Sequence, residues 1–199
     1  MQIFVTGTDT NVGKTVISSW LALRMNAHYW KPIQTCAPNE EDDAKVVQRI
    51  AKLPENRIIP SAYSFNQPVS PHLAAKLAGQ AIDFDSFKLP KISPLIVEGA
   101  GGVMTPINDD YKIIDLIKKF NILTVIVARS SIGTINHTCL TIEALRSRNI
   151  QIWGVIMNGP KNIDNKQAIE KYGKVKVLVE FEHIDNLNYD QLKRAYERQ

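Results

Sequence analysis

The stretch Thr6–Thr15 near the start of the chain, TGTDTNVGKT, constrains the fold more than any other segment. An apolar run, Ile3–Val5, leads into it, and a helical pattern that begins at Lys14 leads out of it. A strand, a glycine-containing loop ending in Gly-Lys-Thr, and a helix form a phosphate-binding loop when they follow one another. Backbone N–H groups and the helix N-terminus then surround an anion. The sequence therefore predicts a phosphate site at this corner.

Lys14 and Thr15 are the chemically specific residues of this loop. In such loops the lysine lies against the outer phosphates and the hydroxyl coordinates Mg²⁺. The usual motif has four residues between its two glycines, which would place a glycine at position 8. This chain has Thr8 there, and Gly7 stands one residue earlier. An ordinary strand-turn-helix corner is the alternative, but it does not account for Gly, Lys and Thr together.

The composition is that of an ordinary globular protein. The 199 residues favour one domain spanning 1–199, with 44% apolar and 22% charged residues. The net charge is +4, and no long run of Lys or Arg concentrates it. A nucleic-acid partner is therefore not favoured, whereas a small anionic substrate fits this charge as well.

The cysteines and the apolar runs indicate a cytoplasmic protein without a membrane partner. Cys36 and Cys139 are the only cysteines, and their separation is not that of a metal site. The first strand follows Met1 almost directly, so no signal peptide is expected. The longest apolar run, Ile122–Ala128, is far shorter than the roughly 20 residues that cross a bilayer.

Apolar runs rich in β-branched residues alternate with helical patterns along the chain. This alternation predicts an α/β fold of the P-loop NTPase type, a doubly wound, mainly parallel sheet with helices on both faces. The segment Pro54–Pro71 is rich in Pro, Ser and Asn and is expected to be a long surface excursion. The predicted strands are Gln2–Val5, His28–Lys31, Leu95–Val97, Leu123–Ala128, Ile152–Met157 and Lys176–Val179. The predicted helices are Lys14–Met25, Asp42–Leu53, His72–Ala78, Ile113–Phe120, Ile135–Arg148, Asn165–Tyr172 and Tyr189–Glu197.

Ligands of such sheets bind beyond the carboxyl ends of the strands, so the residues there are candidates for function. Lys31 ends the second predicted strand, and Pro32 keeps its backbone extended. Taken alone, Lys31 is also compatible with a solvated surface charge. The acidic run Glu40–Asp43 opens a helix, which favours a capping role but leaves a magnesium ligand open.

Glu98 ends the third predicted strand and precedes a glycine-rich segment, Gly99–Gly102. A buried carboxylate is costly without a partner, and in phosphate-loop proteins a carboxylate at such a strand end accompanies Mg²⁺. The glycines let backbone N–H groups approach a phosphate closely. Gly133, before a later helix, suggests a loop that binds an anion. Asn158 either forms a turn or reads a base edge with its amide.

Together these residues resemble the dethiobiotin synthetase family. The resemblance covers positions 5 to 158 in the family's order and is weak over the last ~40 residues. It rests on VTGTDTNVGKT at Val5–Thr15, Lys31-Pro32, Asp43-Ala44, Ser70-Pro71-His72, VEGAGG at Val97–Gly102, GTINH at Gly133–His137 and Asn158.

The resemblance implies an ATP-dependent ligase of biotin biosynthesis. Its substrates would be 7,8-diaminononanoate, CO₂ or bicarbonate, and ATP with Mg²⁺. One amine captures CO₂ as a carbamate, which takes the γ-phosphoryl group to give a carbamic–phosphoric anhydride. The second amine then closes a cyclic urea, and ADP and phosphate are released. Because carbamate and triphosphate are both anionic, cations must be fixed between them.

The same resemblance assigns residues. The implied catalytic residues are Lys31, Lys14 and Thr10. The implied ATP contacts are Asn11, Val12, Gly13, Lys14, Thr15, Val16, Asp43, Glu98, Gly99, Ala100, Gly101, Asn158 and Gly159. The implied Mg²⁺ ligands are Thr15, Asp43 and Glu98. The implied substrate contacts are Thr35 and, from the other subunit of a homodimer, Gly133, Thr134, Ile135 and Asn136.

Two departures and two rivals accompany this interpretation. Glu182-His183-Ile184 replaces the family's usual nucleotide-contacting segment, and Gly159 stands where an acidic residue is common, so relaxed base selectivity is compatible with the sequence. A regulatory ATPase of the ParA/MinD group would carry a second lysine early in the loop, where this chain has Thr8, Asp9 and Thr10. A small-molecule kinase would need an arginine-rich lid, and no Arg cluster stands in a suitable loop.

Overall fold

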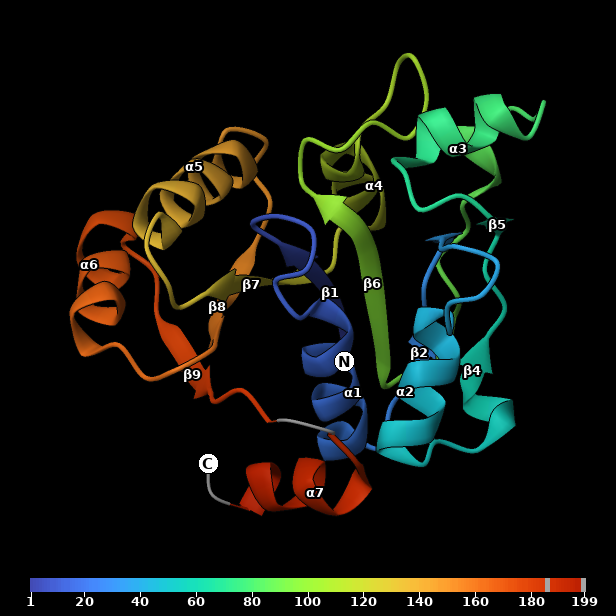
Figure 1. The fold of residues 1–199 in the computed structure, drawn as a ribbon. Helices are drawn as coiled ribbons and strands as arrows, with labels where there is room; N and C mark the ends of the chain where they lie inside the picture. Colours follow the sequence, from blue (N-terminus) through green and yellow to red (C-terminus); the bar gives the residue numbers. More distant parts are fainter. Residues whose placement is uncertain (185–186, 198–199) are drawn as a thin grey trace.

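The structure, a computed structural model, describes residues 1–184 and 187–197, and a parallel sheet runs through its centre (Figure 1). Within these residues the sheet has seven strands in the order β4-β2-β6-β1-β7-β8-β9. In sequence order they are β1 (Gln2–Gly7), β2 (His28–Trp30), β4 (Ile58–Ile59), β6 (Leu95–Gly102), β7 (Leu123–Arg129), β8 (Ile152–Asn158) and β9 (Val177–Phe181). All their pairings are parallel. A second, two-stranded sheet pairs β3 (Ile33–Thr35) with β5 (Tyr63–Phe65).

Helices cover both faces of the central sheet, as the sequence predicts. One face carries α1 (Lys14–Met25), α2 (Asp43–Ala51) and α7 (Tyr189–Glu197), which pack on one another (Figure 1). The other carries α4 (Ile113–Phe120), α5 (Thr134–Arg146) and α6 (Ile163–Gly173), while α3 (Pro71–Leu77) packs against β3 and β5. Two short 3-10 helices, η1 (Glu55–Arg57) and η2 (Phe84–Ser86), complete the described elements.

Alternating side chains of the central strands build two separate cores. Ile3 and Val5 of β1 join Ile17 and Trp20 of α1 in one apolar cluster, whereas Phe4 joins the opposite cluster. Successive side chains of a strand point to opposite faces, so a strand buried on both sides must be apolar at every position. This requirement explains why β1 carries the continuous run Ile3–Val5 and why it lies inside the sheet.

The topology places the phosphate loop at a central position. Strand β1 lies between β6 and β7, so the ends of all three meet at one edge of the sheet. Glu98 lies opposite Val5 in the register, and Val127 lies opposite Gly7. The loop between β1 and α1 therefore starts with Glu98 on one side and the end of β7 on the other.

The structure corrects several predicted elements. The segment Pro54–Pro71 is not a simple surface excursion, because it contains β4 and β5 and buries Phe65 at 3% exposure. Strand β6 continues to Gly102, so the glycines after Glu98 belong to a strand. Asp42 is the N-cap of α2, where its side chain accepts from Lys45 N at 2.8 Å, and the helix begins one residue later than predicted.

Candidate active site

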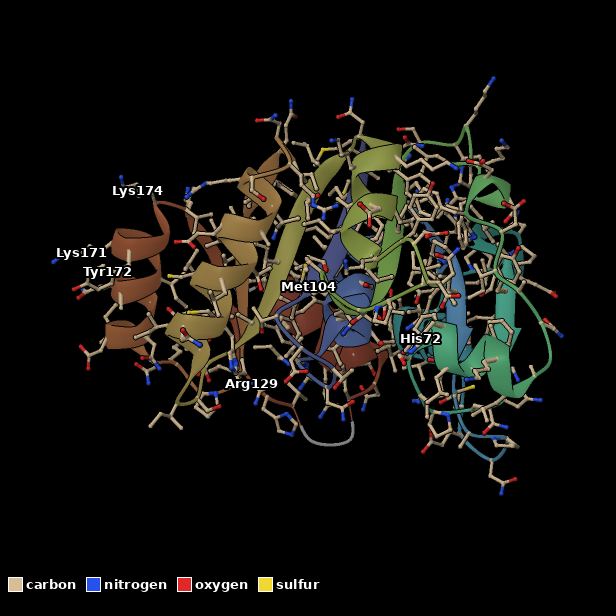
Figure 2. All side chains as sticks on the ribbon, turned by 90° about the horizontal axis from the view of Figure 1, so that it is seen from above. His72, Met104, Arg129, Lys171, Tyr172 and Lys174 are labelled. Carbon is tan, nitrogen blue, oxygen red and sulfur yellow. The ribbon has the colours of Figure 1, made fainter. Side chains whose placement is uncertain are left out.

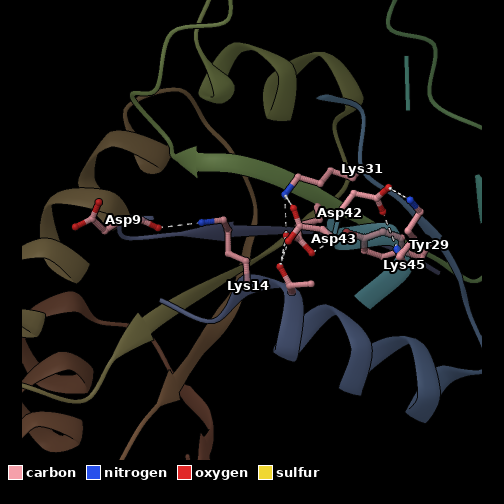
Figure 3. Close-up of polar contacts among 9 residues, drawn as sticks. Asp9, Lys14, Tyr29, Lys31, Asp42, Asp43 and Lys45 are labelled. Atoms are coloured by element: carbon pink, nitrogen blue, oxygen red, sulfur yellow. Dashed lines mark hydrogen bonds and ion pairs between the residues drawn. The ribbon is translucent and has the colours of Figure 1, made fainter. Parts of the chain in front are cut away.

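Lys14 follows the phosphate loop, and its side chain reaches back to the backbone of the loop. Lys14 is the first residue of α1, is 8% exposed, and donates from Nζ to the Asp9 carbonyl oxygen at 2.9 Å (Figure 3). Gly13 precedes it with a φ of 94°, a left-handed conformation that favours glycine. A Cβ on Gly13 would also lie 2.0 Å from the Asn158 amide nitrogen. Both strain and space therefore require glycine at this position.

Neighbouring strands hold the loop at two further points. The backbone N–H of Thr8 donates to the Val127 carbonyl in β7 at 3.0 Å. The Asn158 amide, at the end of β8, donates to the Val12 carbonyl at 3.0 Å. This bond makes Asn158 a support of the loop, whereas its contact with a base stays a prediction. One N–H and the amide oxygen of Asn158 remain for a ligand.

A cation and two carboxylates meet beside this loop. Lys31 Nζ lies 2.5 Å from Asp43 Oδ2 and 3.2 Å from Glu98 Oε1. The Thr15 hydroxyl bonds to Asp43 and lies 3.0 Å from Glu98 Oε1. The structure thus brings together residues from α1, α2, β6 and the end of β2, which lie far apart in the sequence (Figure 3). Lys31 is 7% exposed and Glu98 is 1% exposed, so this cluster is largely shielded from water.

The charges of the cluster reinforce one another. Burial alone would lower the pKa of Lys31, but the carboxylates of Glu98 and Asp43 outweigh it and raise that pKa. Burial alone would raise the pKa of Asp43, but the Lys31 ammonium and hydrogen bonds from Lys31, Thr15 and Gln34 lower it. Burial lowers the pKa of Lys14, partly opposed by Glu98. Lys31 and Asp43 are therefore both held charged around neutral pH.

Thr15, Asp43 and Glu98 offer the oxygen donors that magnesium prefers. A hydroxyl and two carboxylates that already converge fit a Mg²⁺ ion that keeps phosphate oxygens and waters as its other ligands. Within residues 1–184 and 187–197, no group of three or more His, Cys, Asp or Glu is arranged to hold a metal. The donor set of Thr15, Asp43 and Glu98 fits a metal that arrives with a phosphate, since three protein oxygens leave the other coordination positions of Mg²⁺ to phosphate and water.

Thr10 lies in the loop next to Asp9, and the first residues of α5 follow the end of β7. The Thr10 backbone N–H donates to Asp9 Oδ1 at 2.7 Å, and its side chain is exposed. Gly133 has a φ of 88° before α5, and the Thr134 hydroxyl donates to the Arg129 carbonyl at 2.5 Å. A cavity of about 350 Å³ lies between the start of the loop and the later turns of α5. Its lining comes from Thr8 and Asp9, from Gly102 at the end of β6 and the following residues 103–105, and from His137, Leu140, Thr141 and Ala144 of α5.

The remaining predicted residues are spread along the strand ends. Asn11 has a φ of 55° in the loop, and Val16 is half-buried in the first turn of α1. Gly99, Ala100 and Gly101 lie in β6, and Gly159 follows β8. Thr35 ends β3 and is half-buried, and its substrate role stays a prediction. Ile135 and Asn136 lie in the first turn of α5.

Two further segments of interest in the sequence lie at the start of α3 and after β9. Ser70 and His72 bond to each other, Oγ to Nδ1, at 3.0 Å at the start of α3. Glu182, His183 and Ile184 line a cavity of about 660 Å³ between the end of β9 and α7. That cavity also contains Lys161, Lys166 and Arg194, which make it more polar than a typical base site.

Sequence reasoning missed Tyr29, Gln34, and the Asp9–Arg129 pair. The Tyr29 hydroxyl is buried and donates to Glu98 Oε2 at 3.0 Å, while Gln34 bonds to Asp43. Arg129 at the end of β7 bonds to Asp9 at 2.8 Å. A tyrosine in a predicted strand of the central sheet is itself a signal, because its hydroxyl needs a polar partner when it is buried.

No helix in the described part of the chain is long and apolar enough to span a bilayer.

Comparison with known proteins places the chain in a family. A family profile described as an AAA domain matches residues 1–191. An ATP-dependent dethiobiotin synthetase (BioD) of Paramagnetospirillum magneticum is 51% identical over 92% of this chain and 88% of that protein. The corresponding protein of Lawsonia intracellularis is 44% identical over 97% of this chain and 93% of its own length.

The solved structures that resemble this fold are more distant. A ParA family ATPase from Chlorobium tepidum superposes with a TM-score of 0.55 at 12% identity, covering 99% of this chain and 92% of that one. The structure of a MinC:MinD complex from Aquifex aeolicus superposes with a TM-score of 0.51 at 13% identity, and the match covers 98% of this chain and 85% of that one. At such identities the likeness shows the fold alone and carries nothing about activity.

Proposed function

The chain belongs to the family of ATP-dependent dethiobiotin synthetases, and from that premise we propose how its residues carry out the reaction. It is an ATP-dependent ligase of biotin biosynthesis that closes the cyclic urea of dethiobiotin. The observation that carries the proposal for its site is the position of Lys31. This lysine is buried between two carboxylates, 2.5 Å from Asp43 and 3.2 Å from Glu98, directly beside the phosphate loop.

The first steps bring two anions together. One amine of 7,8-diaminononanoate attacks CO₂ and loses a proton, which gives a carbamate. A carbamate oxygen then attacks the γ-phosphorus of ATP, the bond to ADP breaks, and a carbamic–phosphoric anhydride forms. Lys31 holds the attacking oxygen, while Lys14 stabilises the charge on the phosphoryl group as it is transferred. Thr10 contacts the reacting groups from within the loop.

The last step closes the ring. The second amine attacks the anhydride carbon, phosphate leaves with the C–O bonding pair, and the amine loses a proton. Lys31 and Lys14 are themselves buried, which strengthens the charge that they offer to the anhydride. Thr15, Asp43 and Glu98 would hold Mg²⁺, and this ion supplies charge neutralisation to the phosphates when it is bound.

We propose that the substrate's carboxylate binds at the N-terminus of α5 in a second copy of the chain. Gly133 adopts a left-handed conformation just before α5. Thr134 is tied back through its N–H to the Ser131 carbonyl and through its hydroxyl to the Arg129 carbonyl, so the N–H groups of Ile135 and Asn136 are the ones we propose for the carboxylate. A homodimer would then share each substrate site across its interface. Ile132 at 97% exposure and Leu140 at 57% supply apolar surface next to this segment, which supports such an interface.

We propose that Asn158 and Gly159 contact the nucleotide base, and that the chain acts in the cytoplasm as one domain over 1–199. Val12 and Gly13 supply the backbone of the phosphate cradle. The cavity lined by Glu182, His183 and Ile184 also has Lys161, Lys166 and Arg194 in its wall, and these charged side chains support weak discrimination among bases.

The test is an incubation of the protein with 7,8-diaminononanoate, bicarbonate, Mg²⁺ and ATP. Phosphate release that requires the diamine and matches dethiobiotin formed, measured by mass spectrometry, is the expected result. Phosphate release that does not depend on the diamine would contradict the ligase and favour a regulatory ATPase.

A further inference from the structure

Asp9 of the phosphate loop lies at the junction of three interactions. Its carbonyl oxygen accepts from Lys14 Nζ at 2.9 Å (Figure 3). Its Oδ1 accepts from the Thr10 backbone N–H at 2.7 Å, and its Oδ2 accepts from Arg129 Nη2 at 2.8 Å. The backbone and the side chain of one residue therefore contact both Lys14 and Thr10, to which the proposed function gives chemical roles.

Arg129 anchors Asp9 to the rest of the fold. It is the last residue of β7, so its backbone is fixed in the sheet, and its side chain is labelled in Figure 2. The Arg129 carbonyl accepts from the Thr134 hydroxyl at 2.5 Å. A continuous series of bonds thus runs from Lys14 through Asp9 and Arg129 to the first turn of α5.

The pair lies between the two other supports of the loop. Thr8 is tied to β7 through Val127, and Val12 is tied to β8 through Asn158. Asp9 stands in the segment between these supports, and Arg129 is its anchor outside the loop. The Asp9 and Arg129 side chains are 51% and 37% exposed, so the pair contributes little to the stability of the fold. The Thr10 N–H and then Arg129 lower the pKa of Asp9, which keeps its carboxylate ionised at neutral pH.

We propose that Asp9 and Arg129 form a positioning pair for phosphoryl transfer, in which Arg129 fixes the Asp9 peptide so that Lys14 and Thr10 face the reacting groups. The inference rests on the proposed function for the roles of Lys14 and Thr10. Neither residue of the pair was assigned a role by sequence reasoning. When a group that aligns the reacting atoms is displaced slightly, the reaction rate falls far more than the binding affinity. We therefore expect the pair to affect kcat rather than the affinity for ATP.

Matched variants separate this role from a structural one. Arg129→Gln and Asp9→Asn each remove the ion pair, and each is expected to lower kcat about tenfold with less than about threefold change in the Kd of a non-hydrolysable ATP analogue. The double variant is expected to lose no more than the worse single variant, because the two residues act as one unit. Arg129→Lys keeps the charge and is expected to recover part of kcat. Asp85→Asn is the control, since it breaks an exposed ion pair with Lys119 far from the loop in the sequence.

Amide hydrogen exchange gives a readout that is independent of activity. Peptides covering residues 8–12 are expected to exchange faster in Arg129→Gln than in the wild type, with an unchanged melting temperature. Unchanged kcat in Arg129→Gln, additive losses in the double variant, or unchanged exchange in this loop would each overturn the proposal. A wild type that forms no dethiobiotin would overturn the proposed function instead, while the exchange experiment would still decide whether Arg129 holds the loop.

Discussion

Lys31 Nζ lies 2.5 Å from Asp43 Oδ2, and the same ammonium reaches Glu98 Oε1 at 3.2 Å. A lysine from the end of β2 thus joins the first residue of α2 to a strand in the centre of the sheet. A buried ammonium is tolerated only when it is paired, and two carboxylates this close are tolerated only with a cation between them. Each of the three charges therefore depends on the other two.

Replacing Lys31 with Met should remove turnover while nucleotide binding survives. We expect kcat to fall by about a thousandfold, because a fixed cation at the carbamate oxygen acts mainly as charge develops in the transition state. The Kd of a non-hydrolysable ATP analogue, measured by titration calorimetry, should change by less than about threefold. Lys45→Met is the control, since Lys45 lies in the same region of the chain with a side chain that is 70% exposed. An unchanged kcat would exclude Lys31 from the reaction.

Replacing Lys14 with Ala should abolish ATP turnover without unfolding the chain. The bond that the structure gives to its ammonium is the one to the Asp9 carbonyl, so little of the fold depends on it. We expect dethiobiotin formation to fall by at least about a thousandfold, with a melting temperature close to that of the wild type. Normal dethiobiotin production by this variant would contradict the phosphate-loop assignment.

Tyr29 should set the magnesium requirement through Glu98. Its buried hydroxyl donates to Glu98 Oε2 at 3.0 Å, and burial followed by the charge of Glu98 raises its pKa well above the ordinary value, so it stays a donor. In Tyr29→Phe the second Glu98 oxygen loses its partner, and we expect the Mg²⁺ concentration for half-maximal activity to rise roughly tenfold. Tyr63→Phe removes a hydroxyl that bonds to Ser86 and Asp83, and it serves as the control. The same Mg²⁺ dependence in both variants would refute a role for Tyr29.

The fold could be predicted from the sequence where local pattern and tertiary environment agree. The run Ile3–Val5 is apolar at every position because β1 is buried on both faces. The residues alone are therefore enough to predict a buried strand here. Strand β4 could not be found in this way. It has two residues, Ile58 and Ile59, and it exists because β2 offers them an open edge.

The site was predictable as far as residue types and strand ends reveal chemistry. Thr15, Asp43 and Glu98 were expected near one another, and the structure brings them into contact. The pair of Asp9 and Arg129 is separated by 120 residues, and each is an unremarkable surface charge in the sequence. Its existence depends on β1 and β7 being neighbours in the sheet, a relationship that no local pattern contains.

Asn158 should support the phosphate loop as well as contact the base. Its amide donates to the Val12 carbonyl at 3.0 Å, so Asn158→Ala removes a support that every nucleotide needs. We expect the affinity for inorganic triphosphate to fall about threefold and that for ATP about tenfold, since the base contact is lost in addition. Titration calorimetry with both ligands measures the two effects. Unchanged triphosphate affinity would exclude the support, and equal losses for both ligands would exclude the base contact.

The stabilising effect of Lys31 should depend on pH through Asp43. In the wild type the pKa of Asp43 lies below its ordinary value of 3.8, so the pair stabilises the fold above that pH and the stabilisation is lost as the pH falls through the lowered pKa. The pKa of Lys31 is raised above 10.5, so the ammonium stays charged throughout this range. In Lys31→Met the opposing cation is gone, and burial would raise the pKa of Asp43 above 3.8. As the pH falls, protonation of Asp43 then removes the unpaired buried charge of the variant, and its destabilisation decreases.

The free energy of unfolding of Lys31→Met should therefore be lower than that of the wild type by about 3 kcal/mol at pH 7, and the difference should shrink toward pH 4. Urea unfolding of both proteins at several pH values measures it, and the titration of groups far from Asp43 cancels in the difference. A difference that stays constant from pH 7 to pH 4 would mean that Asp43 does not depend on Lys31 for its charge. In that case the cluster would be held together by the Thr15 hydroxyl and the Gln34 amide, both of which also lower the pKa of Asp43.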